Sequence, residues 1–300
     1  MARWPALHAG SSVGRSVPGL GSLLGVPTVL ITGASTGIGQ ATALRLARGS
    51  WTVLAGVRRH QDGERLAGEA PAGKIEVLEL DVTDPVQIAA AAARVGGTGL
   101  DALVNNAGVG VGGPLEVLTE EEWRRQFDVN FFGQIAVTRA LLPALRSARG
   151  RIVFLSSIGG KVAMAFTAPY AASKHAVEAL GDALRVELHR SNVQVALVEP
   201  GSVATPIWDK GRADAERVVI PPDLLTEYGQ VPAAMDKVLT ETAKRGVPPD
   251  QVAETIERAL TARRMRARYV VGRDARALLL ARRLLPDHVF DRIIRRALGV

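Results

Sequence analysis

Tyr170 and Lys174 are the residues whose types and spacing point most directly to chemistry. Positions four apart share one face of a helix, so the phenol and the ammonium group are expected to be neighbours. A tyrosine with a pKa of about 10 is a poor base at neutral pH, and a nearby cation lowers that pKa by stabilising the phenolate. The pair therefore predicts a group that donates and accepts a proton. Ser157, which follows an apolar strand, is expected to hold a carbonyl or alkoxide oxygen beside the phenol.

A glycine-rich turn early in the chain predicts a phosphate-binding loop. Residues 32–39 read Thr-Gly-Ala-Ser-Thr-Gly-Ile-Gly and lie between an apolar strand and a helical pattern. Gly33 permits a tight turn, Gly37 lets the backbone approach a pyrophosphate, and Gly39 lets the helix pack against the strand. The N-terminus of that helix presents free N–H groups to the anion. This context favours a dinucleotide site over a simple bend.

The end of the second predicted strand indicates which dinucleotide binds. NAD-binding domains usually carry an acidic residue there, which accepts hydrogen bonds from the adenosine ribose. This strand ends instead in Val57-Arg58-Arg59, with no acid in reach. A guanidinium group binds a 2′-phosphate through two charge-assisted hydrogen bonds, so Arg58 favours NADP(H) over NAD(H). The alternative is that both arginines are ordinary surface charges. Asp81 ends the third strand, and two compatible roles are open for it: capping the next helix and hydrogen-bonding the adenine.

The elements that must position these residues alternate along the chain. Short strands that are apolar throughout lie inside a parallel sheet covered by helices. We therefore predict the α/β class, with a doubly wound, Rossmann-type parallel sheet and helices on both faces, in a single domain. The expected strands are 29–32, 52–57, 75–80, 100–104, 151–155, 193–198 and 268–271. The expected helices are 38–48, 86–95, 120–146, 170–189 and 251–264.

Domain boundaries follow from the same pattern. Residues 1–26 are rich in Gly, Ser and Pro without apolar periodicity, and we expect a disordered N-terminal extension there. Residues 27–272 form the Rossmann-type domain, within which the irregular segment 206–249 is expected to be a substrate lid. Residues 273–300 are expected to form basic amphipathic helices.

Composition excludes several classes of protein. The 300 residues include no cysteine, which excludes disulfide scaffolds and thiol catalysis, and five scattered histidines, so we expect no metal site. The net charge is +7, but twelve arginines and three aspartates after residue 257 contribute +9, which leaves −2 for the body. Those arginines lack interleaved aromatic residues, so we expect no nucleic-acid partner. No apolar run approaches the length of about 18 residues that a membrane-spanning helix needs.

These motifs resemble those of the short-chain dehydrogenase/reductase family over about residues 27–205. The matching pieces, in chain order, are the turn 32–39, Asp81, Asn105-Asn106-Ala107-Gly108, Asn130, Ser157, Tyr170 with Lys174, and Pro200-Gly201 with Thr205. Within the family, the second strand and the extended C-terminus are closest to the steroid and retinol dehydrogenase-like members.

The resemblance implies a role for each matching residue. Tyr170 is the catalytic acid and base, and Ser157 positions the substrate oxygen. Lys174 binds the nicotinamide ribose and tunes Tyr170, while Asn130 holds a water that relays protons. The implied cofactor-binding residues are Gly33, Ser35, Thr36, Gly37, Ile38, Gly39, Arg58, Asp81, Val82, Asn106, Ala107, Gly108, Tyr170, Lys174, Pro200, Gly201, Val203 and Thr205.

The substrate is expected to be a small lipophilic alcohol or ketone, because the segments 109–114, 158–167 and 206–249 that would enclose it are rich in apolar side chains. We therefore predict an oxidoreductase that transfers a hydride between NADP(H) and the alcohol or carbonyl of a steroid, retinoid or long-chain substrate. Two alternatives remain: an enzyme similar to β-ketoacyl carrier-protein reductase, and a non-catalytic nucleotide-sensing relative.

The two long helices resemble those through which family members form homodimers or homotetramers, so we expect a homo-oligomer. Residues 287–298 carry an apolar stripe opposite several arginines. Such a stripe packs on its own domain, on a partner subunit, or on a membrane surface. We expect a cytoplasmic protein, with peripheral membrane contact through this helix as the alternative left open.

Overall fold

The computed structural model describes residues 26–49, 51–97, 99–207 and 219–298. Within these residues, seven parallel strands form one sheet in the order β3-β2-β1-β4-β5-β6-β7. The strands are β1 (Thr28–Thr32), β2 (Thr52–Val57), β3 (Ile75–Glu79), β4 (Ala102–Asn105), β5 (Arg151–Leu155), β6 (Gln194–Pro200) and β7 (Arg268–Val271). The helices that flank or follow them are α1 (Gly37–Arg48), α2 (His60–Gly68), α3 (Pro85–Val95), α4 (Glu120–Phe127), α5 (Gly133–Ala148), α6 (Ala168–Glu187), α8 (Leu225–Tyr228), α9 (Val231–Arg245), α10 (Pro249–Thr261), α11 (Arg273–Leu284) and α12 (Asp287–Leu298). The predicted doubly wound α/β fold is confirmed.

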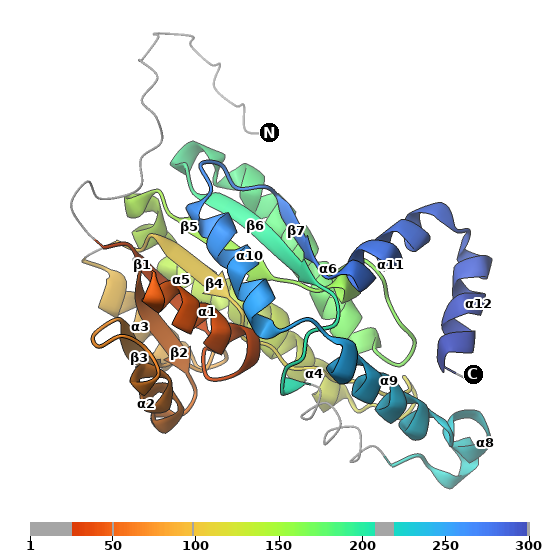
Figure 1. Cartoon of the computed structure of the whole chain (residues 1–300). Helices are drawn as coiled ribbons and strands as arrows, with labels where there is room; N and C mark the ends of the chain where they lie inside the picture. Colours follow the sequence, from red (N-terminus) through yellow and green to blue (C-terminus); the bar gives the residue numbers. More distant parts are fainter. Residues whose placement is uncertain (1–25, 50, 98, 208–218, 299–300) are drawn as a thin grey trace, which may run out of the picture.

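Alternate side chains of each strand pack on opposite faces of the sheet. In β1, Val29 and Ile31 join an apolar core with α1, α2 and α10, whereas Leu30 joins a second core with α3, α5 and α6. Figure 1 shows α1 and α10 side by side over one face of the sheet. Because the strands are parallel, their carboxyl ends meet at one edge, where doubly wound folds bind their ligands.

The long helix predicted over 120–146 is present as continuous helical backbone from Glu120 to Ala148, but it is not a regular α-helix throughout. A π-helical turn, Asp128–Phe132, separates α4 from α5. Inside this turn Asn130 is fully buried, and its side-chain amide forms two hydrogen bonds with the backbone of Val109. Its Oδ1 accepts from Val109 N at 2.8 Å, and its Nδ2 donates to Val109 O at 3.0 Å. The irregular turn therefore holds the loop that follows β4. Such π-helical turns are frequent at functional sites.

The segment 206–249 contains more regular structure than the sequence indicated, since it includes the 15-residue helix α9. Val231, which begins α9, is 1% exposed and anchors the helix on the body of the domain. Much of the rest of α9 is polar, which hid its helical pattern. Residues 208–218 of the predicted lid lie outside the described residues, as does the predicted N-terminal extension except for Val26.

Helices α11 and α12 project beyond β7 (Figure 1), and α12 returns to contact α9. The apolar stripe of α12 is divided. Phe290 is 5% exposed and lies under the guanidinium of Arg282, 5.6 Å from the ring centre, whereas Ile293 is 49% exposed. Part of the stripe therefore packs on its own domain. Among the helices that the structure describes, none is both long enough and apolar enough to cross a membrane.

Candidate active site

A cavity of about 1180 Å³ runs along the carboxyl ends of the strands. It is lined by all four predicted catalytic residues and by every predicted cofactor-binding residue except Gly39. These residues come from eight separate segments of the chain, so their meeting at one cavity is a property of the fold. At this edge of the sheet, residues that are separated by up to about 170 positions in the sequence lie around one cavity.

The glycine loop after β1 leaves the N-terminus of α1 open toward this cavity. Thr36 is the N-cap of α1 and makes no side-chain capping hydrogen bond, and the first turn holds no acidic residue. Gly37 has φ +59, and a Cβ there would lie 3.2 Å from Thr205. A Cβ on Gly39 would collide with the backbone oxygen of Gly33. Gly39 therefore packs directly against the glycine loop, but it does not line the cavity. Free N–H groups at this end of α1 suit a phosphate.

The loops after β1 and β4 are joined by hydrogen bonds at the floor of the cavity. Asn106 Nδ2 donates to Thr32 O at 2.8 Å and to Gly33 O at 3.0 Å. In return, the Thr32 hydroxyl accepts from the backbone N–H groups of Asn106 and Ala107, each at 3.0 Å. The residues between 32 and 39 and those between 105 and 108 therefore form one rigid unit.

Ser157, Tyr170 and Lys174 converge where β5 ends and α6 begins. The Ser157 hydroxyl accepts from Gly159 N at 3.0 Å and forms a hydrogen bond with the Tyr170 phenol. Lys174 Nζ donates to Leu155 O at 2.8 Å and lies 5.8 Å from the centre of the Tyr170 ring. The phenol, the hydroxyl and the ammonium group thus share one wall of the cavity.

The predicted lowering of the Tyr170 pKa is wrong for the structure as it stands. Burial raises the pKa of the Tyr170 phenol, and the hydrogen bond from Ser157 offsets only part of this rise. Burial also lowers the pKa of Lys174 to about 8, while the negative charge of Glu178 opposes that change. Desolvation by the protein packed around the phenol is therefore the larger effect at Tyr170.

The two arginines after β2 have different surroundings. Arg58 is exposed and lines the cavity, whereas Arg59 turns away and binds Asp62 through Nε at 2.8 Å and Nη2 at 3.1 Å. Asp81 also lines the cavity, and its carboxylate accepts from Thr83 N and Oγ1 at 2.9 and 2.7 Å. The cap of α3 is a different residue, Asp84. The cap reading of Asp81 is therefore wrong.

Comparison with known proteins agrees with this geometry. The sequence profile of short chain dehydrogenases matches residues 27–216. The chain belongs to the short-chain dehydrogenase family. It is therefore an oxidoreductase whose fold binds a nicotinamide cofactor.

Relatives cover nearly the whole dehydrogenase. It is 36% identical over 274 residues to the NADPH-dependent 3-dehydrocapnine reductase of Ornithobacterium rhinotracheale, which covers 88% of this chain and 94% of that one. It is 37% identical over 280 residues to retinol dehydrogenase 5 of Mus musculus, over 89% and 87% of the two chains. A solved short-chain dehydrogenase from Streptomyces avermitilis is similar with a TM-score of 0.73 and 30% identity, over 90% of this chain and 96% of that one.

The far end of the dehydrogenase cavity is apolar but carries charges at its border. Of the predicted substrate wall, Val109, Val111, Ile207 and Met235 line the cavity, whereas Leu225 is 53% exposed and does not. Trp208 and Val218 of that wall lie outside the described residues. Lining residues that sequence reasoning missed are Glu121, Arg124, Arg125, Phe132 and Leu239. They lie on α4, on the π-helical turn and on α9. The irregular turn and the polar character of α9 concealed which face of each element lines the cavity.

The buried Gln126 was also missed. Its Oε1 accepts from Val111 N at 2.7 Å and its Nε2 donates to Val109 O at 3.0 Å. Together with Asn130 it fixes the loop after β4, which borders the apolar end of the cavity. A lone glutamine in an otherwise exposed charged helix gives no sequence signal for this role.

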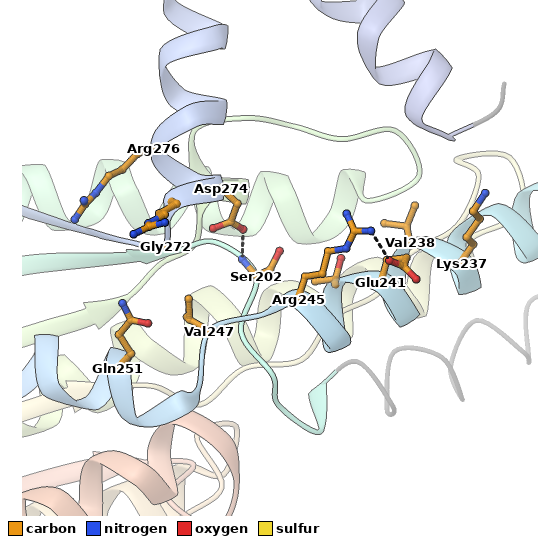
Figure 2. A pocket seen from close by; sticks show the side chains of 12 residues that line it. Ser202, Lys237, Val238, Glu241, Arg245, Val247, Gln251, Gly272, Asp274 and Arg276 are labelled. Carbon is orange, nitrogen blue, oxygen red and sulfur yellow. Dashed lines mark hydrogen bonds and ion pairs between the residues drawn. The ribbon is translucent and has the colours of Figure 1, made fainter.

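A second cavity, of about 640 Å³, lies behind the loop 201–205. Gly201 and Val203 line the first cavity, whereas Ser202 between them lines the second. Figure 2 shows Asp274 at the start of α11 pointing to Ser202, whose N–H donates to Asp274 Oδ2 at 2.7 Å. The second cavity is bordered by paired charges such as Arg245 with Glu241, 3.1 Å apart. The loop is thus a thin wall between the two cavities.

Proposed function

We propose that this dehydrogenase interconverts an alcohol and its carbonyl on a lipophilic substrate, with NADP(H) as cofactor and Tyr170 as the catalytic acid and base. The observation that carries the proposal is the convergence of Ser157, Tyr170 and Lys174 on the same cavity as the open N-terminus of α1. A phosphate-binding helix end and a proton-transfer group at one cavity are what hydride transfer requires.

The residues present fit a nicotinamide dinucleotide. The uncapped α1 terminus and the backbone at Gly37 would hold the pyrophosphate, and the loop from Pro200 to Thr205 would enclose the nicotinamide end. When bound, the cofactor supplies or accepts the hydride at the substrate carbon. Arg58, which directly follows β2 and lines the cavity, would bind a 2′-phosphate. The NADPH dependence named for the Ornithobacterium relative supports this choice.

The chain's own residues move the proton. Because burial raises the pKa of Tyr170, the phenol is protonated at neutral pH and donates its proton to the oxygen of a carbonyl substrate. The Ser157 hydroxyl holds that oxygen in place beside the phenol. The ammonium group of Lys174 stabilises the phenolate that remains after the proton has left.

Asn130 contributes chiefly by position. Its side-chain amide is engaged by Val109, and Nδ2 also reaches Ser173 Oγ at 3.4 Å. A water held at this residue would therefore bind to its backbone carbonyl, in the π-helical turn. The residue keeps the loop after β4 in the conformation that borders the substrate end.

The substrate class rests on the cavity and on the relatives. Val109, Val111, Ile207 and Met235 offer an apolar wall, and the mouse relative is named a retinol dehydrogenase. We assign the segment 206–249 as the substrate lid because Met235 and Leu239 of α9 reach the cavity. A steroid, a retinoid or a long-chain alcohol or ketone fits such a lining.

Assembly and location belong to the same proposal. Phe132, in the π-helical turn after α4, is 55% exposed, and Val186, on α6, is 69% exposed. These apolar side chains support a homodimer or homotetramer formed through the long helices. A cytoplasmic enzyme with peripheral contact to an anionic membrane surface is supported by Leu280, Leu284 and Ile293, which are exposed among the arginines of α11 and α12.

A substrate panel tests the proposal. Hydroxysteroids, retinoids and long-chain alcohols are assayed with NADP⁺, and the matching carbonyls with NADPH, by following absorbance of the reduced nicotinamide. We expect turnover with at least one lipophilic class and none with the Tyr170→Phe variant. If the purified protein binds NADPH yet turns over no member of the panel, the lipophilic substrate class is wrong.

A further inference from the structure

Two buried carboxyl groups meet one helical turn beyond Lys174. Glu178 on α6 is 5% exposed, and Glu199 on β6 is 1% exposed. Arg268 Nε lies 3.0 Å from Glu178 Oε2 and also 3.0 Å from Glu199 Oε1, so both carboxyl groups converge on one nitrogen atom. Lys161 Nζ lies 2.7 Å from Glu178 Oε2. None of these groups has a part in the proton transfer described above.

The single hydrogen on Arg268 Nε cannot serve both carboxylates. An arginine Nε carries a single hydrogen, and that of Arg268 is directed to Glu178 Oε2. Among the described residues, Glu178 Oε1 and Glu199 Oε1 are buried without a hydrogen-bond partner. Two bare carboxylate oxygens in a buried site are unfavourable. A proton held by one carboxyl group turns it into a donor, and a hydrogen bond between the two glutamates then satisfies both oxygens.

Burial and the charge of the neighbouring glutamate oppose ionisation of both carboxyl groups, although cations surround them. The cations that face the pair are Lys161, Lys174 and Arg268, and the other carboxylate is Asp182, which binds Arg268 Nη2 at 2.6 Å and is also bound by Arg185 at 2.9 Å. Burial, and then the charge of Glu178, raises the pKa of Glu199 to about 7.

We propose that Glu178 and Glu199 share one proton and that this carboxyl pair positions and charges Lys174, the residue that tunes the catalytic phenol. The pair then carries one negative charge, which favours the ammonium form of the desolvated Lys174. Glu199 is followed directly by Pro200, so the same pair also supports the start of the loop that encloses the nicotinamide end. The part of the inference that concerns Lys174 rests on the proposed function, whereas the shared proton does not.

Infrared difference spectroscopy tests the shared proton without any need for activity. The carbonyl stretch of a protonated carboxyl group is followed from pH 5 to pH 9 in H₂O and D₂O. We expect a band that titrates near pH 7 and that is lost in both Glu199→Gln and Glu178→Gln. The matched control is Glu187→Gln, an exposed position on the same helix, which should keep the band. Absence of the band, or its survival in both variants, overturns the shared proton.

The pH dependence of turnover tests the effect on Lys174. Above about pH 7 the wild-type pair has lost its shared proton and carries two negative charges, of which Glu178→Gln removes one. The alkaline limb of kcat in this variant should therefore move to lower pH by about one to two units. Glu187→Gln should keep the wild-type limb. An unmoved limb in Glu178→Gln overturns the charging of Lys174. A wild-type protein that shows the infrared band but no turnover would instead contradict the proposed function and leave the carboxyl pair standing.

Discussion

The Asp274 carboxylate accepts a hydrogen bond of 2.7 Å from the backbone N–H of Ser202 and so ties α11 to the wall of the cofactor cavity. Gly201 leaves room for this contact, since a Cβ there would come within 2.6 Å of Asp274 Oδ1. The loop 201–205 is therefore fixed by a hydrogen bond to Asp274, which lies more than seventy positions later in the chain. The C-terminal helix α11 is thus connected to the wall of the site through Asp274.

Replacing Asp274 by alanine should weaken cofactor binding more than it slows chemistry. Loss of a hydrogen bond at a solvent-accessible site costs about 1 kcal/mol, which corresponds to a rise of roughly fivefold in KM for NADPH. Asp274→Asn keeps an acceptor oxygen and should restore most of the affinity. Asp287→Asn is the control, because Asp287 binds Arg282 on the same pair of helices away from the loop. Equal KM values in all three variants would remove the role of Asp274.

Tyr170→Phe should abolish turnover and leave nucleotide affinity nearly unchanged. The variant keeps the ring and loses only the phenolic group that forms the hydrogen bond with Ser157. A missing acid and base lowers kcat by about 100-fold to 10,000-fold. Steady-state kinetics and fluorescence titration of NADPH measure the two effects separately. The opposite result, with binding lost and turnover kept, would overturn the assignment of Tyr170.

Arg58→Ala should raise KM for NADPH far more than for NADH. A charge-assisted hydrogen bond to a phosphate contributes about 1.5 to 3 kcal/mol, so a tenfold to hundredfold change is expected for NADPH alone. Arg59→Ala is the matched control, because Arg59 already binds Asp62 and does not line the cavity. Equal changes for the two cofactors would contradict the preference for NADP(H).

The sequence was sufficient to predict the strands of the sheet, because strand periodicity and the glycine turn are local signals. The strand Arg151–Leu155 and the helix that carries Tyr170 were predicted within two residues of their observed bounds. The sequence was also sufficient to name the residues that meet at the cavity, since in a parallel sheet the carboxyl ends of the strands are brought to one edge.

What escaped prediction depends on contacts between distant segments. The π-helical turn at Asn130 arises from the bonds of that side chain to Val109, and the pKa of Tyr170 is decided by the protein packed around it. Arg59 was indistinguishable from Arg58 until the structure showed its bond to Asp62. The partnership of Asp274 with Ser202 likewise joins segments that no local pattern relates.

The raised pKa of Glu199 predicts how stability changes with pH. The folded protein holds a proton on this carboxyl group up to a pKa of about 7, whereas the unfolded chain loses it near the ordinary value of 4.5. The folded state therefore binds more protons between these values, and the contribution of Glu199 to stability falls as pH rises from about 4.5 to 7. Glu199→Gln imitates the protonated form and should remove this loss. We measure the free energy of unfolding of both proteins by urea denaturation at pH 5 and pH 8. From the lower to the higher pH, the free energy of unfolding of the variant should rise by on the order of 3 kcal/mol relative to that of the wild type. Glu187→Gln should follow the wild type at both values, and a constant difference between Glu199→Gln and wild type across this range would show that Glu199 is ionised in the folded protein.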